Sequence, residues 1–153
     1  MTISSIQAGK IICELSGWET STLRLQKLLY ISQLFYVGEK TGRLIREDFE
    51  AWKFGPVEPK LYRYCRGYGS DYIPNIFPMD VGVNGDDPEY KFLKTITMAM
   101  QGGNGRKRIT EAKLVSYTHR DGGAWDIIRN VEKKVVIPYE LIENEYKEKI
   151  EES

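Results

Sequence analysis

The longest helical pattern in the chain lies between Thr20 and Gly42, and it constrains the fold more than any other feature. N-capping residues at 20–22 precede side chains that recur at i, i+3, i+4 and i+7. The positions on this face are Leu25, Leu28, Leu29, Ser32, Phe35 and Tyr36. Arg24, Lys27 and Gln33 fall on the other side, where we expect them to face solvent because the helix is predicted to pack on one face.

Shorter patterns predict the remaining elements. Capping residues, or a proline in the first turn, mark helices that begin near residues 4, 59, 88, 110, 124 and 138. Short strands near Ala51 and Val136 are expected to pair, whereas residues 70–87 show no regular pattern. We therefore predict a mainly α protein, a single compact domain over residues 1–153. It has about six helices and a small β hairpin or strand pair.

Charge and apolar content limit the classes of protein to consider. The chain has 153 residues, of which 41% are hydrophobic, enough for one core. Its 22 basic and 22 acidic residues cancel, so nucleic acid is an unlikely partner despite the short basic run at 106–108. No apolar run reaches the roughly 18 residues of a membrane span, and no secretion signal opens the chain. We expect a cytoplasmic protein with no membrane partner.

No catalytic signature is complete. The glycine-rich, basic segment 102–108 breaks the P-loop spacing, and His119 is the single histidine. Cys13 and Cys65 belong to no metal-binding pair, so neither a zinc site nor a disulfide framework is indicated. We expect no enzymatic activity, no catalytic residue, no metal and no cofactor.

Two sequence blocks, at 25–30 and 50–57, resemble the Panacea domain family, a phage-associated family that includes SocA-type antitoxins and GepA-like proteins. Weaker similarities follow in order at 61–62, 68–69, 116–119, 124–125 and 137–138, so the resemblance spans roughly residues 6–146. Two departures stand out. Gly123 and Ala124 precede Trp125 where proline is usual, which predicts a looser turn after His119, and residues 73–87 have no counterpart.

The resemblance implies an antitoxin of a toxin–antitoxin system, one that neutralises a cognate toxin from a neighbouring gene by direct protein binding, in the context of phage defence. Two other functions stay open. The protein could be a proteolytic adaptor that delivers the toxin to a AAA+ protease. It could also be a small-ligand-sensing module that uses the region of Trp52, Lys53 and His119.

The family motif contains nine residues with chemistry of interest: Lys27, Tyr30, Trp52, Lys53, Gly55, Pro56, Thr118, His119 and Trp125. Lys27 and Tyr30 are neighbours on one helix face, and residues 52–56 form a stiff turn. If the turn docks on the helix, the motif is either a structural clasp, with Trp52 packed and Lys53 paired to a carboxylate, or a recognition groove. We favour the clasp, because a family that serves many toxins needs a shared fold more than a shared contact.

Toxin contacts are then expected where the sequence is free to vary, in residues 73–87 and their neighbours or in the tail helix. The candidate contact residues are Tyr72, Ile76, Phe77 and Tyr146. Large aromatic side chains of this kind anchor many protein interfaces.

Overall fold

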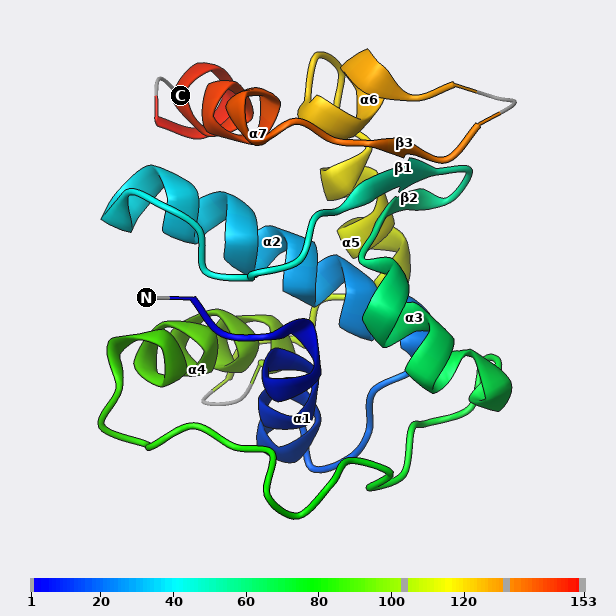
Figure 1. Cartoon of the computed structure of the whole chain (residues 1–153), viewed down its shortest axis with the longest axis vertical. Helices are drawn as coiled ribbons and strands as arrows, with labels where there is room; N and C mark the ends of the chain where they lie inside the picture. The colour runs from blue at the N-terminus through cyan, green and yellow to red at the C-terminus, as the bar shows by residue number, and fades with distance from the viewer. Residues whose placement is uncertain (1, 103–104, 131–132, 152–153) are drawn as a thin grey trace.

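A computed structural model describes residues 2–102, 105–130 and 133–151. The described residues form seven α-helices and one three-stranded antiparallel sheet (Figure 1). The helices are α1 Ser5–Leu15, α2 Thr22–Lys40, α3 Pro59–Cys65, α4 Pro88–Gln101, α5 Glu111–Thr118, α6 Ala124–Ile128 and α7 Tyr139–Glu145. A 3-10 turn, Arg66–Tyr68, follows α3, and a π-helical turn, Tyr146–Glu151, follows α7. The predicted mainly α fold is confirmed.

Local capping chemistry explains where the helices begin. The Ser4 side chain accepts from the Gln7 backbone N–H, and the Ser4 N–H donates to the Gln7 side chain, which closes a capping box at α1. The Ser21 side chain caps α2 by accepting the Arg24 N–H, and the Thr110 side chain caps α5 by accepting the Lys113 N–H. At α3 the Glu58 carboxylate accepts two backbone N–H groups, just before a proline at the first helical position.

The sheet joins three distant parts of the chain. Its strands are β1 Glu50–Trp52, β2 Gly55–Val57 and β3 Val135–Val136, in the order β2-β1-β3. Glu50 pairs with Val136, so the predicted strand pair is confirmed. The sequence placed only a turn at 55–56, but these residues belong to a second strand, because a tight turn at 53–54 returns the chain alongside β1.

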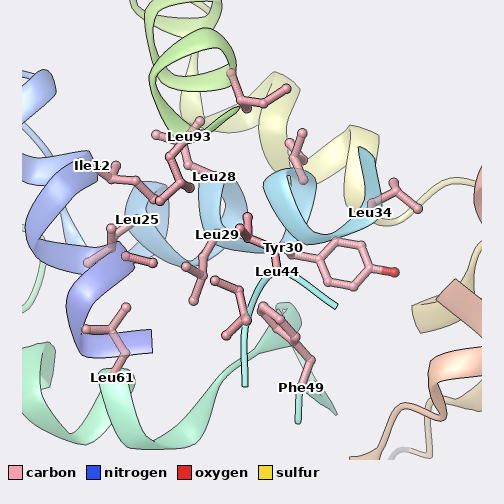
Figure 2. Close-up of a cluster of buried hydrophobic side chains, with 14 of the residues drawn as sticks. Ile12, Leu25, Leu28, Leu29, Tyr30, Leu34, Leu44, Phe49, Leu61 and Leu93 are labelled. Carbon is pink, nitrogen blue, oxygen red and sulfur yellow. The ribbon is translucent and has the colours of Figure 1, made fainter. Parts of the chain in front are cut away.

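Helix α2 runs through the middle of the molecule. Figure 1 shows α6, α7 and the sheet on one side of it and α1 and α4 on the other. In Figure 2, Leu25, Leu28 and Leu29 of α2 meet side chains of several other elements. The prediction that Arg24, Lys27 and Gln33 face solvent is wrong, because residues 24–34 of α2 are buried on every face of the helix. None of the helices in the described residues combines the length and apolar character needed to cross a membrane.

Candidate functional site

The β1–β2 hairpin docks on α2 through Lys27. The Lys27 Nζ donates to the backbone carbonyl of Pro56 over 3.2 Å, and the side chain is 1% exposed. Burial lowers the pKa of this ammonium to about 8. Within the described part of the chain no carboxylate forms an ion pair with Lys27. The site therefore contains a buried cation with a single acceptor.

Gly55 leaves the space that this cation occupies. Its φ of +117° lies in the region that favours glycine. A Cβ built at Gly55 would lie 2.7 Å from the Lys27 Nζ and 2.9 Å from the His119 Nε2. Two nitrogen groups from α2 and from the end of α5 thus converge on one backbone position of β2. Any side chain at residue 55 would displace them.

His119, Trp125 and Trp52 form a connected set. The His119 and Trp125 rings stack with centroids 3.8 Å apart and an interplanar angle of 13°. The Trp125 indole N–H donates to the Trp52 carbonyl over 2.7 Å, which joins α6 to β1. Burial lowers the pKa of His119, as do the nearby charges of Lys27 and Arg129, so its imidazole is uncharged at neutral pH. The buried Nε2 has no hydrogen-bond partner among the described residues.

The Trp52 indole packs as the clasp hypothesis expects, but Lys53 does not behave as it expects. Trp52 is half-buried, meets the Tyr62 ring edge-on at 4.8 Å and donates its N–H to Glu50 over 2.8 Å. Lys53 is exposed, and its ammonium lies 5.4 Å from the centroid of the Phe54 ring. The predicted carboxylate pairing of Lys53 is wrong for the described residues, because the tight turn projects this side chain away from the body of the protein.

Tyr30 belongs to a separate cluster, one helical turn from Lys27. Its hydroxyl donates to the buried carboxylate of Glu145 over 2.7 Å, and its ring meets Phe49 edge-on. Glu145 also accepts the Ala124 N–H and pairs with Arg120. Burial raises the pKa of Glu145. This cluster ties α7 to α2 and α6.

The hydrogen bond between Glu145 and Ala124 was not predicted from the sequence. Nothing marks Glu145 among the many acidic residues of the tail, so sequence reasoning missed it. Ala124 occupies a position where the family usually has proline, and its free N–H makes a bond that proline cannot make. In the turn after His119, Gly122 donates its N–H to the Asp126 side chain and Gly123 donates its N–H to the Arg120 carbonyl, and the looser turn stays a prediction. Thr118 is buried and donates to its own helix, at Val115.

Two grooves adjoin the hairpin and share Trp52, Lys53 and Lys134. The first groove, of about 440 Å³, lies between the start of α2, the hairpin and α3, and Lys27 contributes to its floor. The second groove, of about 450 Å³, lies between the hairpin, Trp125 and residues 129–134, of which 129, 130, 133 and 134 are described. The motif residues that form the clasp therefore also border open surface.

The four candidate toxin contacts lie outside both grooves. Tyr72 is 54% exposed, whereas Phe77 is 6% exposed and packs against Trp18 and Tyr64. Ile76 is half-buried, and Tyr146 is half-buried against Phe35. Phe77 thus has little surface to offer a partner. Contact with a toxin stays a prediction for all four residues.

The chain matches a known family. Residues 25–84 match the family described as "Antitoxin SocA-like, Panacea domain", which confirms the resemblance inferred from the sequence. Six of the nine motif residues lie inside this range, whereas Thr118, His119 and Trp125 lie beyond it. The match reaches into residues 73–84, so the expectation that this part has no family counterpart is wrong.

A curated relative supports the same family. The chain is 33% identical over 119 residues to "Antitoxin SocA" of Caulobacter vibrioides, a match that covers 72% of this chain. The chain spans 60% of the length of that relative. No solved structure matches the chain. Among the described residues no group of three or more His, Cys, Asp or Glu side chains is placed to hold a metal ion.

Proposed function

We propose that this protein is an antitoxin that neutralises a cognate toxin by binding it directly. The observation that carries the proposal is the 33% identity to a protein named as an antitoxin, together with the family match over residues 25–84. The surface is suited to binding a protein, because the two grooves place large aromatic rings beside exposed cations. We infer that the toxin is encoded by a neighbouring gene.

A growth assay tests the proposal. Each flanking reading frame is expressed alone and then together with this protein, and the pair is purified to look for a complex. We expect one frame to arrest growth, growth to return when both are made, and the two proteins to elute as one complex. Growth arrest that this protein does not relieve, or relief without a complex, would refute neutralisation by direct binding.

A second candidate is small-ligand sensing, favoured by the size of the first groove. Its volume of about 440 Å³ lies within the range of ligand pockets, and Lys27 supplies a polar group on its floor. A ligand at 100 times its dissociation constant would raise the free energy of unfolding by about 2.7 kcal/mol. Thermal unfolding across a panel of nucleotides and metabolites measures this shift, and an unchanged melting temperature throughout would rule against the second candidate.

A further inference from the structure

Cations and aromatic rings are prominent among the described residues that line the two grooves. The charged residues that line them are Lys27, Lys53, Arg66, Arg129, Lys133 and Lys134, and no aspartate or glutamate is among the described lining residues. Because the chain as a whole has 22 charges of each sign, this concentration of positive charge is local. A surface of one sign attracts a partner of the opposite sign.

The cations lie close to aromatic faces. The Lys134 ammonium lies 3.8 Å from the centroid of the Trp52 ring, and the Arg129 guanidinium lies 5.0 Å from that of the Trp125 ring. Arg129 also pairs with Asp126, so its charge is partly compensated. Lys134 is exposed and forms no ion pair with a described carboxylate. Lys53 and Lys134 are the two cations that line both grooves, so they are the pair to vary in a test.

The first groove offers apolar surface as well. Leu23 and Phe54 border it and are 42% and 68% exposed, which is high for large apolar side chains. Burial of such side chains by a partner stabilises a complex. A ligand that consisted only of negative charge would leave this surface in contact with water. The occupant is therefore expected to carry large apolar groups beside its charges.

The floor of the first groove adds a specific polar contact. The Lys27 ammonium has three donors, and one of them reaches the Pro56 carbonyl. Burial of a cation without a counter-ion costs free energy. A carboxylate that enters the groove would supply the missing charge. This position therefore favours an acidic group over a neutral one.

From these observations we propose that the two grooves form one docking site for an acidic segment of the partner protein, with carboxylates next to an aromatic or long aliphatic side chain. The inference rests on the proposed antitoxin function, in which that partner is the toxin. A single-stranded nucleic acid would also meet cations and rings. The exposed apolar side chains and the single buried ammonium fit a peptide better, so nucleic acid is an outcome of the test.

Three purified proteins are compared in the experiment: the wild type, the double variant Lys53→Glu/Lys134→Glu, and a matched control, Lys91→Glu/Lys94→Glu. The control reverses two exposed lysines of α4, which lies across α2 from the sheet (Figure 1). Random short peptides displayed on phage are selected on each protein. We expect acidic peptides with an aromatic or aliphatic neighbour from the wild type and the control, and their binding to weaken at least about tenfold in the hairpin variant.

Two results would overturn the docking site. One is peptide selection that is equal on all three proteins, or that yields peptides without acidic residues. The other is a labelled oligothymidylate that binds the wild type, loses affinity in the hairpin variant and is not displaced by any selected peptide, which would assign the grooves to nucleic acid.

Lys27→Met tests the floor separately. Methionine has similar volume and no charge, so the grooves keep their shape, and circular dichroism establishes that the variant folds. We expect the selected acidic peptides to bind about tenfold more weakly, while their amide analogues, with Asn and Gln in place of the acids, bind both proteins equally. A folded variant that binds the acidic peptides as the wild type does would refute the role of Lys27.

The growth assay separates this inference from the function on which it rests. If Lys53→Glu/Lys134→Glu relieves toxicity as well as the wild type does, the docking site is refuted and the antitoxin function stands. If the wild type relieves no toxicity while the grooves still select acidic peptides, the function is refuted and the groove chemistry is supported. We expect the hairpin variant to lose relief and the α4 control to keep it.

Discussion

Three buried polar residues of α2 differ in their surroundings. Arg24 and Gln33 have several partners each, although the Arg24 Nε has none among the described residues. Both terminal nitrogens of Arg24 reach backbone carbonyls, at Met100 and Ile109, and the Gln33 side chain accepts from two backbone N–H groups. Lys27, on the hairpin side, has one acceptor and lies beside a His119 nitrogen that has none among the described residues.

The number of hydrogen-bond partners distinguishes buried polar groups that stabilise the fold from those that do not. A buried polar group with full partners fixes the geometry of the elements that it joins. A buried cation with one partner lowers stability, and such groups cluster at functional sites. We therefore expect Arg24 and Gln33 to stabilise the fold, and we expect a binding role on the hairpin side of α2. Four substitutions test these expectations.

Arg24→Met should have the largest effect. Methionine fills similar space but removes the donor of the Ile109 carbonyl and one of the two donors of the Met100 carbonyl, which keeps the Ile109 N–H. We expect the free energy of unfolding to fall by about 2–4 kcal/mol, since each unsatisfied buried group costs about 1–3 kcal/mol. Urea unfolding of the purified protein measures the change. A loss under about 1 kcal/mol would show that Arg24 does not hold the fold.

Gly55→Ala should destabilise the protein by about 1–3 kcal/mol, because it adds backbone strain and pushes against Lys27 and His119. Gly17→Ala is the matched control. Gly17 also has a positive φ, but nothing lies within 4 Å of the Cβ that alanine would add. The excess loss at residue 55, measured by thermal unfolding, reports the crowding together with the greater backbone strain of a φ of +117° against +67° at Gly17. Equal losses at the two positions would contradict the close approach.

Lys27→Met should raise the free energy of unfolding at pH 7 by about 1–2 kcal/mol, because replacing a buried charge by an apolar group is often stabilising. The gain should depend on pH. Since burial lowers the pKa of Lys27 from 10.5 to about 8, the unfolded wild type binds more protons between these values, and its stability rises with pH there. The advantage of the variant should therefore shrink from pH 8 to 10.5. A constant advantage, or a clear loss at pH 7, would remove the contrast with Arg24.

Lys53→Ala should have the smallest effect on stability. The side chain is exposed and pairs with no described carboxylate, so we expect a change within about 0.5 kcal/mol. Toxin binding, measured on the same sample by calorimetry, should nevertheless weaken. A stability loss above about 1 kcal/mol would mean that Lys53 belongs to the structural group.

Much of the fold was predictable because its signals are local. Ser4, Ser21 and Thr110 cap helices through their own next turn, so the helix starts follow from neighbouring residues. The strand pair at Glu50 and Val136 was found from short apolar, β-branched segments. The site was predictable in part. The motif identified Lys27, Gly55, His119 and Trp125 as residues of interest, but it did not show that they lie next to one another in the fold.

The rest was not predictable because hydrophobic periodicity does not identify the partner of a polar side chain. Arg24, Lys27 and Gln33 are polar positions in the helical pattern, and that pattern does not tell whether water or a buried backbone group satisfies each of them. Glu145 is one carboxylate in an acidic tail, and only its approach to Tyr30 and Ala124 distinguishes it.

The sequence alone determined the helix starts, the strand pair at Glu50 and Val136 and the resemblance to the family, since these depend on residues that are close in the chain or on short motifs and their order. The tertiary structure alone decided that residues 24–34 of α2 are buried on every face, that Lys27 and His119 converge on Gly55, and that two cationic, aromatic grooves share Trp52. Such features arise from contacts between residues far apart in sequence. Their free energies depend on burial and geometry, which exist only once the chain is folded.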